Sequence, residues 1–501
     1  MKTAFNDLRE LLIEIDALES IVELLNWDQV VYMPPNGTEA RSRQLAILAR
    51  LAHEKLTDPK LQKLLNNLES YQKDIKYDSY EASLIRVTQY LYEKATHVPA
   101  DFQGKFYAHV AKAQQAWIKA RSENDFEIVH PFLEKTLELS REYANFFPGY
   151  EHIADPLVDL YDPGMKVSTI RPIFATVRQY LIPMIHAITE QPVPDNSFLR
   201  QSFPEPSQLS FGLDVIGKIG FDFKGGRQDK SAHPFTTRLS ISDVRITTRV
   251  EKNDFWDAFS STMHEAGHAL YYQGIDHDLE GTPLAQAASA GVSESQARLW
   301  ENIVGRCRSF WEYFYPRLQS NFPKQLRDVS LESFYHAINR VQPSLIRTEA
   351  DEVTYNLHVI MRFDFELQLL EGNLAIRDLP EAWRERFKKD FGISLSNDSD
   401  GVLQDPHWYD GFIGGQFQCY TLGNIMSAMF FEAATKANPE IFNEIKRGQF
   451  DTLSNWLRKS IYRLGRKYTP LELVELVAGT QLTVEPYFRY LKTKYGELYS
   501  L

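Results

Sequence analysis

The pattern of apolar residues predicts that most of the chain is helical. Between Leu8 and Leu25 apolar side chains recur at intervals of three and four residues, which places them on one face of an α-helix. The same spacing predicts further helices over residues 37–56, 81–95, 101–123, 128–147, 167–188, 295–318, 330–340, 349–371, 421–436 and 470–492. Proline, glycine, asparagine and aspartate occupy the breaks between these segments, as expected of turns and helix ends.

One segment departs from the helical pattern. The residues from Phe235 to Val250, FTTRLSISDVRITTRV, are rich in threonine, isoleucine and valine and partly alternate polar with apolar. This composition favours one or two strands, and hence a small sheet within a helical protein. The free edge of such a strand can pair with an extended peptide, or the segment can be a purely structural hairpin. The sequence leaves both interpretations open.

Composition narrows the class of protein without changing this picture. The 501 residues include 55 basic and 67 acidic side chains, and the resulting charge of −12 argues against nucleic-acid binding. The two cysteines, Cys307 and Cys419, favour a reducing compartment. Neither a signal-peptide pattern nor a membrane-spanning apolar run is present. We therefore expect a cytoplasmic protein that does not bind a membrane. With no repeat and no low-complexity linker, residues 1–501 are predicted to form a single domain.

The sequence His264-Glu265-Ala266-Gly267-His268 brings metal-binding chemistry to one predicted helix. Residues four apart lie one above the other on a helix, so both imidazoles project from the same face and can reach one zinc ion. Glu265 lies one step round the helix, where it can act as a general base without ligating the metal. Asn253 or Asp254 is suited to cap the start of this helix and Gly274 to end it.

A zinc peptidase site needs a third protein ligand and one open position. The acidic residues that follow the helix are Asp276, Asp278, Glu280, Glu294 and Glu301. The residues from Ser293 to Gln296 predict a helix start with Ser293 as its N-cap, which places Glu294 in the first turn. Composition does not decide between Glu294 and Glu301 as the third ligand.

Five motifs occur in an order that resembles one known family. They are Asp243-Val244-Arg245-Ile246-Thr247 (DxRxT), His264–His268 (HExxH), Glu294-Ser295-Gln296 (HESQ-type), Ile346-Arg347-Thr348-Glu349-Ala350-Asp351 (IRxxAD) and Gly401–Trp408 (GxxQDxHW). On these motifs the chain resembles the carboxypeptidase Taq family of thermostable metallocarboxypeptidases. Segments 24–44, 117–126 and 158–165 extend the resemblance to nearly the whole chain.

The resemblance implies both a fold and an activity. It implies an almost entirely helical, two-lobed fold with a long central groove and a small β-sheet, similar to angiotensin-converting enzyme and neurolysin. It further implies a single catalytic domain that releases C-terminal residues one at a time from peptides, with broad side-chain tolerance. Glu294 is then the third zinc ligand, cobalt can replace zinc, and the protein is a homodimer.

The resemblance also assigns roles to residues outside the metal helix. Arg347 is expected to bind the substrate's C-terminal carboxylate because guanidinium forms paired hydrogen bonds with carboxylates. Arg245 is expected either to help or to form a structural ion pair with a neighbouring acid. His407 and Tyr420 are the expected hydrogen-bond donors to the reacting carbonyl, with Tyr409 as the alternative to Tyr420. The aspartates expected to orient histidines or arginines are Asp243, Asp351 and Asp405.

Two departures from the family pattern leave alternatives open. Ser293 stands where the family has a histidine, and we expect it to keep the helix cap. The loop from Gly414 to Tyr420 lacks one tyrosine and one proline and places Tyr420 one residue late. The alternatives are an oligopeptidase that cuts internally and a catalytically silent peptide-binding homologue. The intact set of two histidines, Glu265 and Glu294 argues against the silent homologue.

Overall fold

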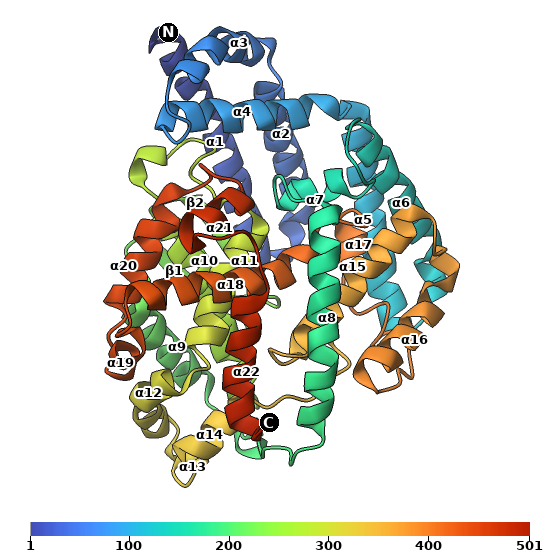
Figure 1. Cartoon of the computed structure of the whole chain (residues 1–501). Helices are drawn as coiled ribbons and strands as arrows, with labels where there is room; N and C mark the ends of the chain where they lie inside the picture. Colours follow the sequence, from blue (N-terminus) through green and yellow to red (C-terminus); the bar gives the residue numbers. More distant parts are fainter. Residues whose placement is uncertain (1) are drawn as a thin grey trace. The chain divides into compact units, whose positions relative to one another are not determined.

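The computed structural model describes residues 2–501, which are mainly helical (Figure 1). Helices account for 69% of the chain, and the described residues contain one three-stranded sheet. The predicted fold class, mainly helical with a small sheet, is confirmed. None of the helices described is both long and apolar enough to cross a membrane.

The chain divides into two compact units, and each is assembled from three separate segments. Unit 1 consists of the residues up to Thr96 together with Asp195–Ile338 and Ser427–Gln481. Unit 2 consists of His97–Pro194, Asn339–Met426 and Leu482–Leu501. The division agrees with the two lobes that the family resemblance implies, whereas a single catalytic domain over residues 1–501 stays a prediction.

Most of the predicted helices are present with small shifts at their ends. Unit 1 contains α1 (Lys2–Val31), α2 (Thr38–Leu56), α3 (Pro59–Asp74), α4 (Tyr80–His97, which ends at the boundary), α9 (Glu205–Ile219), α10 (Phe255–Gly274), α11 (Ala290–Arg298), α12 (Arg308–Asn321), α13 (Pro323–Leu326), α14 (Leu331–Ile338), α19 (Ile441–Lys446), α20 (Asp451–Ser460) and α21 (Pro470–Ala478). Unit 2 contains α5 (Ala100–Glu123), α6 (His130–Asn145), α7 (Asp155–Tyr161), α8 (Val167–Thr189), α15 (Tyr355–Glu371), α16 (Leu379–Phe391), α17 (His407–Asp410) and α22 (Glu485–Tyr499). Helix α18 (Gln418–Ala437) begins in unit 2 and ends in unit 1.

Two predicted helices are interrupted. The segment predicted over 295–318 consists of the end of α11, the π-helix η5 (Leu299–Val304) and α12. Helix α12 begins directly after Cys307, whose backbone is extended. The segment predicted over 470–492 consists of α21 and α22. Gly479 separates them because its left-handed backbone, at φ 70°, ends α21.

The sheet lies in unit 1 and has the strand order β1-β3-β2. Strands β2 (Thr236–Ser240) and β3 (Asp243–Thr248) are the predicted strands, and they pair antiparallel. The prediction missed β1 (Gly226–Lys230), which pairs parallel with β3, because its sequence GRQDK lacks apolar alternation. Strand β2 is therefore an edge strand of this sheet.

Helix α10 packs against the sheet on one side and against α9 and α11 on others (Figure 1). Asp254 is its N-cap, since its carboxylate accepts hydrogen bonds from the backbone N–H groups of Trp256 and Asp257. Phe255 and Phe259 are buried and contact aromatic rings of α9 and α12. One face of α10 is thus packed in the core. This packing fixes the rotation of the helix about its axis, and therefore the direction in which the side chains of its opposite face point.

Candidate metal centre

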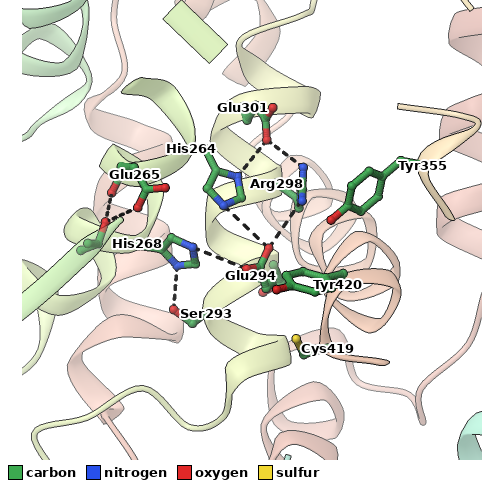
Figure 2. Close-up of polar contacts among 12 residues, drawn as sticks. His264, Glu265, His268, Ser293, Glu294, Arg298, Glu301, Tyr355, Cys419 and Tyr420 are labelled. Carbon is green, nitrogen blue, oxygen red and sulfur yellow. Dashed lines mark hydrogen bonds and ion pairs between the residues drawn. The ribbon is translucent and has the colours of Figure 1, made fainter. Parts of the chain in front are cut away.

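The imidazoles of His264 and His268 point from α10 towards Glu294 on α11 (Figure 2). The Nε2 atom of His264 lies 3.8 Å from Glu294 Oε2, and that of His268 lies 3.7 Å from Glu294 Oε1. One ligand atom from each of the three residues falls within 4.8 Å of the others. The structure therefore brings together the three residues that the sequence and the resemblance propose as ligands.

These three side chains fit a divalent metal ion. Metal–ligand distances of about 2.0–2.2 Å around a tetrahedral ion separate ligand atoms by roughly 3.3–3.6 Å, close to the distances found here. Glu294 Oε2 is buried and has no hydrogen-bond partner within the described residues, as expected of an oxygen meant for an ion. Two imidazole nitrogens and one carboxylate are a usual ligand set for zinc in a hydrolytic site.

Each imidazole is held from behind through its Nδ1 atom. His264 Nδ1 lies 2.9 Å from Glu301 Oε2, and His268 Nδ1 lies 2.8 Å from Ser293 Oγ (Figure 2). When Nδ1 carries the proton and donates it outward, the Nε2 lone pair is free to bind an ion. Both rings are therefore oriented with Nε2 towards the candidate site.

Glu301 stands behind His264 and outside the ligand cluster. Its carboxylate accepts hydrogen bonds from Ser260 Oγ at 2.6 Å and from Arg298 Nη1 at 3.0 Å. Burial tends to raise the pKa of Glu301, but Arg298 and His264 outweigh burial and hold that pKa far below its usual range. The choice between Glu294 and Glu301 that composition left open is therefore decided by geometry in favour of Glu294 as the candidate ligand.

The π-helix η5 carries Glu301 at a position next to α10. A π-helix has wider turns than an α-helix, and such segments often occur at functional sites. Glu301 is buried within η5, directly after α11, so the two helical segments present Glu294 and Glu301 to the same histidine. Arg298, at the junction, lies 3.5 Å from Glu294 Oε2 and bonds Glu301.

The two histidines are in different electrostatic environments. Burial lowers the pKa of His268 to about 4, so this imidazole is neutral near pH 7 and its lone pair is available. Burial and Arg298 also act to lower the pKa of His264, but the hydrogen bond to Glu301 and the charge of Glu294 raise it overall. A metal ion at the site and a proton would therefore compete for the Nε2 atom of His264.

Glu265 projects from α10 beside the two histidines and is only 6% exposed. Its Oε2 accepts a hydrogen bond of 2.6 Å from Thr236 Oγ1 on the edge strand β2. Burial raises the pKa of this carboxyl group, and the charge of His264 and the Thr236 hydrogen bond partly oppose the rise. Thr236 is not among the site residues predicted from the sequence, although it lies in the threonine-rich strand before the metal helix.

Ser293 does not cap α11, contrary to the prediction. The helix begins four residues earlier than predicted, at Ala290, and its N-cap is Ser289, whose Oγ accepts from the Val292 N–H. A serine at either position suits an N-cap, and the chain uses the earlier one. Ser293 therefore lies inside the helix, where its hydroxyl is free to reach His268.

Gly267 sets the distance between the two helices that carry the candidate ligands. A Cβ atom at this position would lie 2.5 Å from Ala297 Cα and 2.8 Å from Gln296 O on α11. Both contacts are with backbone, which cannot move aside easily. The glycine in the H-E-A-G-H sequence therefore permits the close approach of α10 and α11.

The substrate-binding arginine proposed from the resemblance lies in a charged cluster of unit 2. Arg347 is buried and donates to Asp405 Oδ1 through Nε and Nη2, at 3.0 and 2.9 Å, and to Tyr355 through Nη1 at 2.9 Å. Arg362 donates to the other oxygen of Asp405 at 2.5 Å. Two guanidinium groups share one carboxylate, so this group of three has a net charge of +1.

His407 and Tyr420 lie close together in unit 2. His407 Nε2 is 3.1 Å from the Tyr420 hydroxyl, although the two residues are thirteen positions apart in sequence. The altered loop before Tyr420 uses Gly414 and Gly415 with left-handed backbones, and a Cβ on Gly415 would lie 2.1 Å from a backbone oxygen. Tyr409, the alternative to Tyr420, is instead buried and stacked on Trp117.

The remaining predicted residues pair locally. Arg245 forms two hydrogen bonds with Asp243, at 2.9 and 2.8 Å, and its guanidinium lies over the Trp27 ring. Asp351 does not orient a histidine or an arginine as expected. Its carboxylate accepts from backbone N–H groups and from the Thr354 hydroxyl, because it caps the turn that leads into α15.

Comparison with known proteins places this arrangement in context. The sequence profile of the Carboxypeptidase Taq (M32) metallopeptidase family matches residues 7–495. The chain is 38% identical to thermostable carboxypeptidase 1 of Thermus thermophilus over 99% of both chains, and 34% identical to carboxypeptidase 1 of Bacillus subtilis over 98% of both. The crystal structure of an M32 carboxypeptidase from Deinococcus radiodurans R1 is similar with a TM-score of 0.97 and 46% identity over the full length of both chains.

Proposed function

The chain belongs to the carboxypeptidase Taq (M32) family of metallopeptidases, and we propose that it releases single C-terminal residues from peptides with a zinc ion held by His264, His268 and Glu294. The observation that carries this proposal is the convergence of these three side chains beside a buried glutamate, Glu265. Cobalt is proposed as a substitute for zinc because the same ligand types bind both ions.

A zinc ion in this position would supply Lewis acidity, which polarises the scissile carbonyl and lowers the pKa of water. Glu265 accepts the proton of the attacking water and delivers it to the leaving amine. The Thr236 hydroxyl holds one carboxylate oxygen of Glu265, which keeps the other available for that transfer. His407 and Tyr420 are proposed as donors to the negative oxygen of the tetrahedral intermediate.

Recognition of the free C-terminus is proposed for Arg347. Its cluster with Arg362 and Asp405 carries one uncompensated positive charge, which favours binding of a carboxylate. Arg245 remains a second candidate, although its Nε and Nη2 atoms already donate to Asp243.

Peptide binding along the edge strand β2 is supported by the surroundings of that strand. A cavity of about 500 Å³ lies beside it within unit 1, and its lining includes Thr236, Thr237 and Arg238 of β2 and Glu19 and Glu23 of α1. Thr236 links this cavity to Glu265. An extended peptide paired with β2 would therefore run past the general base. Of the two interpretations of the strand segment, peptide pairing is the one proposed here.

The oligomeric state is proposed from the family resemblance alone, and the location in the cell from the composition. We propose a homodimer in the cytoplasm that acts on peptides with a free C-terminus.

The test compares an unblocked peptide with the same peptide amidated at its C-terminus, and follows products by mass spectrometry. With zinc-loaded enzyme we expect stepwise loss of C-terminal residues from the unblocked peptide only. A chelator should abolish the reaction, and Glu265→Gln should slow it by about 10²–10⁴-fold while leaving the bound metal in place.

Other results would identify the alternatives. Internal cleavage of both peptides at equal rates would identify an oligopeptidase. Binding of the unblocked peptide without any cleavage by the metal-loaded protein would identify a silent peptide-binding homologue. Undiminished cleavage by the Glu265→Gln variant would exclude Glu265 as the base.

A further inference from the structure

We propose that Ser293 is a positioning residue for His268, and that its hydroxyl fixes the ring nitrogen which His268 offers to the metal. The inference rests on the proposed metal site and assigns a role to a residue that stands where the family motif has a histidine. Ser293 is not one of the three candidate ligands, and it contacts one of them, so its role is exerted through the imidazole.

The geometry around His268 carries the inference. Ser293 Oγ lies 2.8 Å from Nδ1, while Nε2 on the other side of the ring lies 3.7 Å from Glu294 Oε1. Ser293 and Glu294 are adjacent on α11, so one helix holds both edges of the imidazole (Figure 2). Ser293 is 7% exposed, which keeps water from replacing its hydroxyl easily.

No second residue shares this task. Within the part of the chain that the structure describes, Ser293 provides the only side-chain hydrogen bond recorded for the His268 ring. His264 differs, because Glu301 holds its Nδ1 and is itself held by Arg298 and Ser260. The two candidate ligands thus have unequal support, a charged carboxylate behind one and a single hydroxyl behind the other.

The position of the hydroxyl agrees with this role. A serine inside a helix commonly donates to the carbonyl one turn earlier. Ser293 lies within α11, yet its side-chain hydrogen bonds go to another helix, α10, where it meets the His268 imidazole and the Tyr272 hydroxyl. A hydroxyl oxygen can accept the Nδ1 proton, and the Nε2 lone pair then faces Glu294.

The experiment measures Co²⁺ binding by visible absorption and by competition with a chromophoric chelator. Ser293→Ala is expected to weaken Co²⁺ binding by about 10–100-fold, the usual effect of removing the partner behind a metal-binding histidine. Ser293→Thr keeps a hydroxyl and Ser293→Val has nearly the same shape without one, so this pair isolates the hydroxyl. Co²⁺ affinity should be close to wild type in the Ser293→Thr variant. In the Ser293→Val variant it should be as weak as in Ser293→Ala.

Ser295→Ala is the matched control. Ser295 is a fully buried serine of the same helix, and its hydroxyl donates to the Val292 carbonyl and accepts from the Gln296 side chain, neither of which is a candidate ligand. Its loss is expected to leave Co²⁺ affinity within about twofold of wild type. Circular dichroism of each variant verifies that the helices are intact.

The outcomes separate the two proposals. Failure of the wild-type protein to bind Co²⁺ would contradict the proposed function itself. If the wild-type protein binds Co²⁺ and the Ser293→Thr and Ser293→Val variants bind it with equal affinity, the role of Ser293 is overturned while the proposed function stands. This comparison holds even if the Ser293→Ala variant does not fold. A change in the absorption bands of the Val variant, absent from the Thr variant, would support it, since those bands report ligand geometry.

Discussion

Glu265 and Thr236 illustrate how a single contact sets the chemistry of a residue. The carboxyl group is buried, which raises its pKa, while the hydroxyl on β2 donates to its charged form and holds the pKa down. A general base works best when its pKa lies near the working pH, so the balance of these two effects matters to turnover. Thr236 is therefore part of the catalytic environment although it lies outside the helix.

Removal of that hydroxyl should move the acid limb of activity to higher pH. In Thr236→Val the carboxylate loses a hydrogen bond that stabilises its charged form, so its pKa rises further above the usual range. A higher pKa leaves less of the base deprotonated at low pH, and kcat/KM there falls. A pH profile of kcat/KM checks this. Thr237→Val, whose hydroxyl bonds Glu23 instead, is the control, and an identical shift in both variants would contradict the prediction.

At the scale of elements, the site depends on how closely α10 approaches α11. Gly267 faces the backbone of α11, and the same two helices carry His264 and Glu294, whose Nε2 and Oε2 atoms lie 3.8 Å apart. Any wider spacing would separate the histidines from the carboxylate. The glycine is thus required by contact between helices, since α10 itself would accept alanine at least as well.

Gly267→Ala should therefore damage both stability and metal binding. The added Cβ would overpack the interface, which typically costs about 1–3 kcal/mol, and would displace Glu294 from the histidines. Thermal unfolding and Co²⁺ titration measure the two effects. Gly104→Ala is the control, because a Cβ there meets nothing within 4 Å and alanine favours the helix. Wild-type metal affinity in Gly267→Ala would show that the spacing can adjust.

What the sequence predicts well is local to one element. Spacing along a single helix places His264 and His268 on one face, and the structure agrees. Contacts between elements are not encoded in such spacing, so neither the choice of Glu294 over Glu301 nor the partner of Ser293 was available from periodicity. The helix start was misplaced for a related reason, because Ser289 and Ser293 are equally good caps and packing decides between them.

At the scale of the whole molecule, the candidate ligands all belong to unit 1. His264, His268 and Glu294 lie in its middle segment, as do Glu265 and Glu301. Binding of an ion that the unfolded chain does not hold stabilises the folded state by RT ln(1 + [L]/Kd). The stabilisation is therefore expected to act first on the unit that contains the site.

Hydrogen exchange followed by mass spectrometry can locate that effect. At a zinc concentration about 100 times Kd, we expect α10 and α11 to gain about 2.7 kcal/mol of protection relative to chelated protein. Helix α15, in the core of unit 2, should change little. Equal gains in α10 and α15 would mean that the two units open as one.

The division into interleaved segments has a consequence for biosynthesis. The chain passes from one unit to the other five times, and unit 1 needs residues up to Gln481 while unit 2 needs the last twenty residues. Neither unit has all of its segments until the ribosome has translated nearly the whole chain. Helices α10 and α11 emerge long before the segment Ser427–Gln481 that completes their unit. Nascent chains must therefore wait, partly folded, until translation is nearly finished, and no premature stop before Gln481 leaves a whole unit behind.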